Sequence, residues 1–501
     1  MRLGFAIDNR ACIGCHACTV ACKSEHDVAI GVNRTWVKYI EKGEFPHTRR
    51  SFSVQRCNHC EDAPCVEICP VTSLFRRPDG IVDFDSQRCI GCKACMQACP
   101  YDAIYLDPAT LTAAKCNYCA HRVETGMEPA CVVVCPVEAI VSGDLDDPDS
   151  RIAQLDRTQR VQYPKPEKGT RPKLFYVGGE TAALDPAAAP PVHDYLWSAD
   201  RGVTPAALRA AEEEEGARAR RVYDASRKPA PWDWRVSAYV TTKAVATGLA
   251  MVPFILYLLG RRGEFLPVPA AAVSLLFLAA TGALLVWDLK QPRRFLYVLL
   301  RPQWKSWLVR GAYLITGWGV LLPVCALVSG LGAPGAVQVA CGWVLNLLGA
   351  AVAVYTAMLF AQAKGRDYWQ NPLLAPAMLV DALVAGAAAA TLLGAAGMGG
   401  GLTASEARLA LALGLGANVL LLAAEFLPAH QTQNAERAAR LILRGTLAPM
   451  FWLGVILIGT ALPATVLATG LWPAGASLMM LVGVAVRNHV LVQAPQQVPL
   501  S

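Results

Sequence analysis

The chain has 501 residues, of which 54% are hydrophobic, and a mean hydropathy of +0.33. This length allows two or more domains, and this hydropathy is high for a soluble protein. The net charge of +7 would suit a nucleic-acid partner, but the basic residues gather in loops between apolar segments, which indicates membrane topology and no nucleic acid.

The two halves differ in composition. Residues 1–235 carry most of the charge and 16 of the 18 cysteines, whereas residues 236–495 are rich in Leu, Ala, Val and Gly. We expect three parts: a metal-binding domain over 1–180, a linker over 181–235 and a membrane domain over 236–495.

The N-terminal part contains four groups of four cysteines. Groups one and three share the pattern CIGCxAC, and groups two and four share CNxC, so the region is an internally repeated ferredoxin pattern. In chain order the groups are Cys12, Cys15, Cys18 and Cys22; Cys57, Cys60, Cys65 and Cys69; Cys89, Cys92, Cys95 and Cys99; and Cys116, Cys119, Cys131 and Cys135.

The spacing favours 4Fe-4S clusters. Three thiolates at short spacing wrap one cluster from a tight loop, and the fourth, which we expect to begin a helix, points toward another cluster, as in two-cluster ferredoxins. The alternative is zinc, since a bare C-x2-C pair is typical of zinc ribbons. Sixteen cysteines in four sets predict four clusters instead. The histidines inside the groups, His16, His59 and His121, are expected to donate hydrogen bonds rather than to bind iron.

The N-terminal sequence MRLGFAIDNRACIG has neither an apolar stretch nor a twin-arginine pair before its first cysteine. No export signal is therefore expected. The thiols are expected in the reducing cytoplasm, where disulfides are disfavoured and ordered cysteines indicate metal.

These motifs resemble the four-cluster electron-transfer subunits of the dimethyl sulfoxide and polysulfide reductase family. The likeness covers about residues 4–180 and includes SGDLDDPDSRIAQL and KGTRPKLFYVGG. It implies an α+β tandem bacterial-ferredoxin-like fold in which groups one and four exchange their last cysteines, as do groups two and three. The implied ligand sets are Cys12, Cys15, Cys18 and Cys135; Cys116, Cys119, Cys131 and Cys22; Cys57, Cys60, Cys65 and Cys99; and Cys89, Cys92, Cys95 and Cys69.

The linker begins with the Ala/Pro spacer ALDPAAAPPV. TPAALRAAEEEEGARARRVYDA, residues 204–225, predicts a charged, exposed helix with Thr204 as its N-cap. A solvated helix face is favoured over a docking site for the glutamate run.

The C-terminal part predicts an all-α membrane domain of eight transmembrane helices, because stretches of about 20 apolar residues can cross a bilayer. The spans are 237–259, 266–288, 309–330, 337–362, 373–397, 405–427, 449–469 and 472–492. With eight spans, both ends of the domain lie on one side of the membrane.

The loop charges predict the orientation. The loops on the side of the cysteine domain carry eleven basic residues: Lys290, Arg293, Arg294, Arg301, Lys305, Arg310, Lys364, Arg366, Arg437, Arg440 and Arg444. The opposite side has three: Arg261, Arg262 and Arg408. The positive-inside rule therefore places the cysteine domain in the cytoplasm, at a bacterial inner membrane.

Two further motifs, WDLKQPRRFLYVLLRPQWKSWLVRGAY and YTAMLFAQAKGRDYWQNPLLAP, resemble the eight-helix quinone-reactive subunit of polysulfide reductase and its relatives (NrfD-like). The likeness spans about residues 230–495 and implies that Tyr355 contacts a quinone.

Ionisable residues inside a bilayer are costly and indicate function. Lys243 and Tyr355 are expected to hydrogen-bond the quinone carbonyls, and Asp288, Asp381, Glu425 and His489 to relay protons. Snorkelling to the interface is the alternative for the residues near span ends, Asp288, Arg310, Glu425, Arg487 and His489. All lie in the half of the membrane next to the cysteine domain, whereas the opposite half has only Glu406 and Arg408 at its edge.

Together these features predict the fused electron-transfer and membrane-anchor subunit of a respiratory oxidoreductase complex. Electrons would pass between a molybdopterin-type catalytic subunit, four 4Fe-4S clusters and the ubiquinone or menaquinone pool. The substrate site is expected on the partner chain, since nothing here resembles a molybdopterin pocket. Two alternatives remain: a proton-translocating energy-coupling module, and an anchor that passes electrons to another membrane protein.

Overall fold

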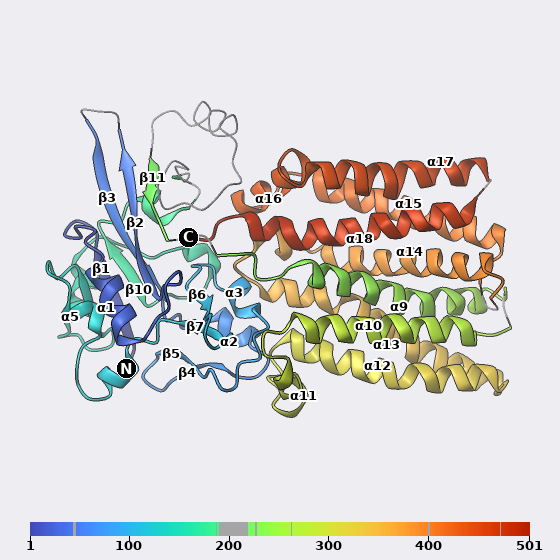
Figure 1. The fold of residues 1–501 in the computed structure, drawn as a ribbon, viewed down its shortest axis with the longest axis horizontal. Helices are drawn as coiled ribbons and strands as arrows, with labels where there is room; N and C mark the ends of the chain where they lie inside the picture. Colours follow the sequence, from blue (N-terminus) through green and yellow to red (C-terminus); the bar gives the residue numbers. More distant parts are fainter. Residues whose placement is uncertain are drawn as a thin grey trace. The chain divides into compact units, whose positions relative to one another are not determined.

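The structure, a computed structural model, describes residues 1–43, 47–186, 188–189, 219–225, 228–261, 263–398, 401–470 and 472–501. The chain divides into two compact units (Figure 1). The N-terminal unit comprises Met1–Pro231 with Pro499–Ser501, and the helical unit comprises Trp232–Val498.

The N-terminal unit is built from small sheets and short helices, as expected for an α+β fold. Its strands are β1 (Leu3–Asp8), β2 (Thr35–Lys42), β3 (Arg49–Arg56), β4 (Leu74–Arg76), β5 (Val82–Phe84), β6 (Ile104–Leu106), β7 (Ala113–Lys115), β8 (Ile140–Asp144), β9 (Val161–Gln162), β10 (Leu174–Val177) and β11 (Arg220–Tyr223). Its helices are α1 (Ala17–Glu25), α2 (Pro64–Ile68), α3 (Ala94–Ala98), α4 (Ala120–Val123), α5 (Ala130–Val133), α6 (Arg151–Thr158), η1 (Pro166–Lys168) and α7 (Thr181–Leu184).

The largest sheet has the order β8-β1-β10-β9. The apolar strand LGFAID supplies its centre: β1 pairs in parallel with β10, with Phe5 opposite Leu174, and antiparallel with β8. Ala6 and Phe175 are buried in its core together with Ile152 of α6. Two hairpins, β4-β5 and β6-β7, repeat one motif within the cysteine-rich region.

The helix predicted over 204–225 is wrong at its C-terminal end. Residues 204–218, with the expected N-cap Thr204, lie outside the described residues, but 220–223 form β11, which pairs with β2. Arg220 faces Glu41 in this pairing and binds its carboxylate at 2.7 Å. Here an available sheet edge outweighs the local helix preference of an arginine-rich segment.

The predicted eight apolar spans are confirmed. Among the described residues, eight helices are long and apolar enough to cross a membrane. They are α9 (Trp234–Leu258), α10 (Val268–Asp288), α12 (Trp307–Gly330), α13 (Gly335–Gln362), α14 (Leu374–Ala395), α15 (Ala404–Phe426), the π-helix η4 (Met450–Ala461) continued by α17 (Leu462–Thr469), and α18 (Pro473–Gln497). The ends agree closely with prediction, except that the last helix continues to Gln497. Shorter helices are η2 (Pro292–Arg294), α11 (Tyr297–Leu300), η3 (Asp367–Gln370) and α16 (Gln433–Leu443).

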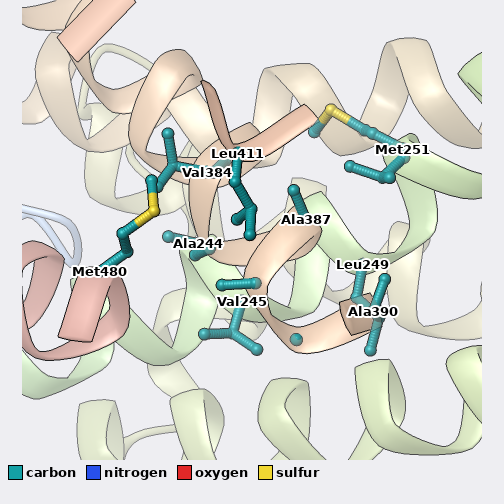
Figure 2. Close-up of a cluster of buried hydrophobic side chains, with 14 of the residues drawn as sticks. Ala244, Val245, Leu249, Met251, Val384, Ala387, Ala390, Leu411 and Met480 are labelled. Atoms are coloured by element: carbon teal, nitrogen blue, oxygen red, sulfur yellow. The ribbon is translucent and has the colours of Figure 1, made fainter. Parts of the chain in front are cut away.

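Small residues let α9 and α14 pack closely. A Cβ on Gly248 would come within 1.7 Å of the Ala382 carbonyl oxygen, and one on Gly386 within 2.1 Å of Gly248. Around this contact lies an apolar core that draws on α9, α14, α15 and α18, and Figure 2 shows Val245, Val384 and other members. Small-residue contacts of this kind are how membrane helices gain packing energy.

Candidate functional site

The cysteine loops repeat one backbone shape. In groups one and three, the glycine before the second cysteine has a positive φ, 71° at Gly14 and 69° at Gly91. So does the residue before the following helix, with 61° at His16 and 62° at Lys93. Positive φ curls the chain so that successive backbone N–H groups face one concavity. A Cβ on Gly14 would also approach the Phe52 ring to 2.3 Å, so space as well as conformation requires glycine there.

The fourth cysteine does not begin a helix, contrary to the sequence prediction. Helices α2 and α3 begin before the third cysteine of their groups, Cys65 and Cys95, and end at the fourth, Cys69 and Cys99. A rise of 1.5 Å per residue puts the fourth cysteine about 6 Å further along the helix axis than the third. One short helix can therefore present thiols to two different places.

The thiols gather across the sequence groups. Electrostatic interaction joins Cys12 to Cys135, Cys22 to Cys116 and Cys131, Cys65 to Cys99, and Cys95 to Cys69. These interactions include the combinations that the resemblance implies, but Cys18 also interacts with Cys131 and Cys116 with Cys57, which the implied sets keep apart. The four ligand sets therefore stay a prediction from the resemblance. We call them site 1 (Cys12, Cys15, Cys18, Cys135), site 2 (Cys57, Cys60, Cys65, Cys99), site 3 (Cys89, Cys92, Cys95, Cys69) and site 4 (Cys116, Cys119, Cys131, Cys22).

The thiols of site 4 line one cavity. Cys22, Cys116, Cys119 and Cys131 surround it together with residues such as Arg56. In the described part of the chain, no three Cys, His, Asp or Glu side chains converge as ligands of a single metal ion. Four sulfur donors around a cavity fit an iron–sulfur cluster, which is larger than one ion.

Backbone amides and burial both act on these sulfurs. The N–H groups of Gly91 and Ala113 each donate to the Cys89 sulfur at 3.4 Å. Burial raises the pKa of the Cys18 thiol to about 11 and that of Cys116 to about 12, because low-polarity surroundings disfavour the thiolate. Since metal ligation requires the thiolate, the positive charge of bound iron would offset this cost.

Two side chains that the sequence analysis does not single out contact site 4. Nη1 of Arg56 donates to the Cys131 sulfur at 3.0 Å, and Nε2 of His26 lies 3.2 Å from the Cys119 sulfur. By contrast, His16, His59 and His121 make no hydrogen bond to a sulfur within the described residues, and His121 pairs with Glu25 instead. The only sequence signal for Arg56 and His26 is nearness to a cysteine motif.

In the helical unit, most of the ionisable residues expected to have a function gather in two buried groups. In the first, the Lys243 group, Nζ of Lys243 on α9 donates to the Ala353 carbonyl at 2.9 Å and to the Thr356 hydroxyl at 2.6 Å on α13. The same Nζ lies 4.5 Å from the centre of the Tyr355 ring. Tyr239, which interacts with both Tyr355 and the buried Asp288, adds a hydroxyl that the sequence analysis missed.

The second, the Arg487 group, joins α14, α15, α18 and η3. Nη1 of Arg487 is 3.0 Å from Oδ1 of Asp381 and also donates to Asn418. Nη2 of Arg487 is 3.7 Å from Oε2 of Glu425, whose other oxygen accepts the Tyr368 hydroxyl at 2.6 Å. Asp381 and Glu425 were expected from the sequence, but their pairing with Arg487 and the contacts of Asn418 and Tyr368 were not.

The Arg487 group forms the polar end of a pocket. The apolar lining includes Leu374, Met378, Leu422, Phe426, Phe451 and Val490. Mostly apolar walls with a few converging polar groups are typical of small-molecule sites.

Two of the expected residues join neither group. Arg310 is exposed and donates to the Trp304 carbonyl at 2.8 Å, which fits snorkelling. His489 is half-buried and makes no hydrogen bond within the described residues. Snorkelling does not apply to Arg487, because its guanidinium is buried and paired. At the opposite helix ends, Glu406 caps α15, and Arg408 donates to the carbonyl that ends α17.

Comparison with known proteins matches both units. Residues 224–499, more than half of the chain, match the family described as Polysulphide reductase, NrfD. Residues 11–74 and 48–145 each match a 4Fe-4S dicluster domain.

Three relatives of the N-terminal unit illustrate the likeness. A tetrathionate reductase subunit of Salmonella typhimurium is 43% identical over 189 residues, which cover 37% of this chain and 76% of that protein. A polysulfide reductase component of Wolinella succinogenes is 40% identical, with 37% of this chain and 98% of the relative covered. Protein NrfC of Escherichia coli K12 is 42% identical, with coverages of 35% and 81%.

Proposed function

The chain belongs to the polysulphide reductase NrfD family, and from this membership we propose that it carries electrons between a separate catalytic subunit and quinone in the membrane. It is an iron–sulfur electron-transfer protein fused to a multi-pass membrane domain. One observation carries the proposal: a single chain combines sixteen cysteines in four sets with buried titratable groups between eight apolar helices.

Each of sites 1 to 4 is proposed to hold one 4Fe-4S cluster. When bound, the clusters supply one-electron transfer steps. The cysteine thiolates bind the iron, the curled loops direct N–H groups at the sulfurs, and burial excludes water. Anaerobic reconstitution of the purified chain is expected to give about sixteen iron atoms per chain. Bound zinc, or far fewer irons, would contradict the assignment.

The quinone headgroup is proposed to lie at the Lys243 group. A quinone needs hydrogen-bond donors at its two carbonyl oxygens and two protons on reduction. The amino group of Lys243 and the hydroxyl of Tyr355 are suitable donors inside the helical unit, and the resemblance supports Tyr355. Asp288, Asp381, Glu425 and His489 are proposed to deliver protons.

Steady-state kinetics with a soluble quinone analogue separate these roles. Lys243→Gln and Tyr355→Phe are expected to raise the KM for the quinone, because they weaken its binding. Glu425→Gln is expected to lower the rate at saturating quinone, because it interrupts proton supply. If instead Tyr368→Phe raises KM while Lys243→Gln does not, the headgroup occupies the pocket at the Arg487 group.

Two alternatives have distinct outcomes. If the chain also translocates protons, Asp381→Asn should abolish the pH change in vesicles while quinone reduction continues. The buried Arg487 group favours this alternative, because it places titratable side chains between the helices. Glu406 and Arg408 at the opposite helix ends disfavour it, because both are already used to cap helices. If the chain relays electrons to another membrane protein, a quinone analogue should leave cluster reoxidation unchanged.

A separate catalytic partner is proposed because the relatives are subunits of tetrathionate, polysulfide and arsenate reductases. That this partner is of the molybdopterin type is proposed from the family resemblance alone. Copurification from native membranes tests this proposal, since a molybdopterin-containing chain is expected in the complex. Recovery of the chain alone, or with a partner lacking that cofactor, would contradict it.

The N-terminal unit is proposed to face the cytoplasm of a bacterial inner membrane. The support is the eleven basic residues in one set of loops against three in the other. Reporter fusions after α9 and after α10 test the topology. A periplasmic signal after α10 would reverse the assignment.

A further inference from the structure

Arg56 is a buried cation with no carboxylate partner among the residues that the structure describes. It ends β3, is 2% exposed, and donates from Nη1 to the Cys131 sulfur at 3.0 Å. Its guanidinium lies 4.6 Å from the centre of the Phe5 ring. Within the described residues, Nε and Nη2 have no hydrogen-bond partner and no ion pair joins Arg56 to an acidic side chain.

The groups near Arg56 that would carry negative charge as thiolates are cysteines of two sites. Cys22, Cys116 and Cys131 of site 4 interact with it electrostatically, and so does Cys18 of site 1. A buried arginine without a counter-charge is strongly unfavourable. The thiolates of a loaded site 4 supply that counter-charge, and the cavity that they line also has Arg56 in its wall.

We propose that Arg56 raises the reduction potential of the cluster at site 4, as a fixed buried cation and as an N–H donor to a ligating sulfur. The inference rests on the proposed function, because it requires clusters at sites 1 and 4. Reduction adds one electron, and therefore one negative charge, to the atoms that Arg56 faces. A nearby positive charge in low-polarity surroundings stabilises the reduced state more than the oxidised state. The N–H···S hydrogen bond acts in the same direction.

Site 1 should respond less than site 4. Cys18 of site 1 interacts electrostatically with Arg56, but only Cys131 of site 4 accepts a hydrogen bond from it among the described residues. Arg56 is therefore expected to raise the reduction potential more at site 4 than at site 1. An electron in the N-terminal unit would be held longer at site 4 than it would be without Arg56.

The test is a redox titration of the full-length chain, followed by electron paramagnetic resonance. In Arg56→Gln, the reduced-to-oxidised ratio of one cluster at a fixed potential should fall at least tenfold, a downward shift of about 59 mV or more for a one-electron couple. A second cluster should shift downward by less. Arg50→Gln is the matched control: Arg50 lies on the same strand but is exposed and pairs with Glu41 at 2.8 Å, so all potentials should stay unchanged.

Iron content separates tuning from structural damage. Arg56→Lys keeps the charge but loses the guanidinium N–H groups, so its shift should be downward and smaller. A variant with full iron and unchanged potentials overturns the proposal, and Arg56→Lys decides the matter if Arg56→Gln loses iron. Absence of clusters from the unmodified chain would instead contradict the proposed function, so the two failures are distinguishable.

Discussion

The contact between Asp381 and Arg487 makes a quantitative prediction about the helical unit. The two charges are 3.0 Å apart and buried. At that distance and an effective dielectric constant of about 20, Coulomb's law gives an attraction of about 5 kcal/mol. Breaking a buried pair costs roughly 3–5 kcal/mol, because one charge is left uncompensated. Arg487 would keep Asn418 and the more distant Glu425, so we expect Asp381→Leu to lower the unfolding free energy by about 3 kcal/mol.

A double-mutant cycle measured by denaturant unfolding in lipid–detergent bicelles tests this prediction. The variants are Asp381→Leu, Arg487→Leu and their combination, which should be less destabilised than the sum of the two, since it leaves neither charge unpaired. The control pair is Arg440 and Glu436, which are 2.7 Å apart on α16 but exposed. Removing Glu436 should cost less than about 1 kcal/mol. Equal losses for the buried and exposed pairs, or additive losses in the cycle, would refute the reasoning.

Two further predictions concern packing and ligand sets. Gly248→Ala should destabilise the helical unit by about 1–3 kcal/mol, because the added Cβ would meet the facing α14 carbonyl at 1.7 Å. Gly282→Ala, which has open space around it, should be neutral or stabilising. Similar unfolding curves for the two variants would contradict the close packing. Cys22→Ser should alter the same electron paramagnetic resonance signal as Cys116→Ser, because both thiols belong to site 4, and the ligand sets are wrong if it alters the signal that Cys12→Ser alters.

The elements that follow from local pattern could be predicted from the sequence. The eight helices were predictable because about twenty apolar residues in a row leave few other structures, and most ends agree closely. The repeat of the cysteine loops was predictable for a similar reason, since Gly14 and Gly91 stand at equivalent positions and adopt the same conformation. The segment 220–223 was not, because its strand depends on a partner about 180 residues away at Glu41.

The candidate sites show the same limit. Asp381 stood out because a carboxylate in an apolar helix is unusual, but its partner Arg487 is 106 residues away and looked like a residue of the helix end. Asn418 and Tyr368 carry no charge, and nothing local distinguishes them from ordinary helix residues. The sequence pattern therefore identified the groups that are costly to bury, whereas their partners could be identified only from the fold.

Two of the buried arginines, Arg487 and Arg56, differ in how far their burial depends on the clusters. Arg487 has its counter-charges, Asp381 and Glu425, within the helical unit, so its burial is balanced by protein groups alone. Arg56 faces thiols, and burial raises the pKa of the Cys18 and Cys116 thiols, because low-polarity surroundings disfavour the thiolate. Iron ligation converts the thiols to thiolates and thereby supplies the missing counter-charge. We therefore expect folding of the N-terminal unit to depend on cluster binding, whereas the helical unit has its ion-pair partners within its own helices.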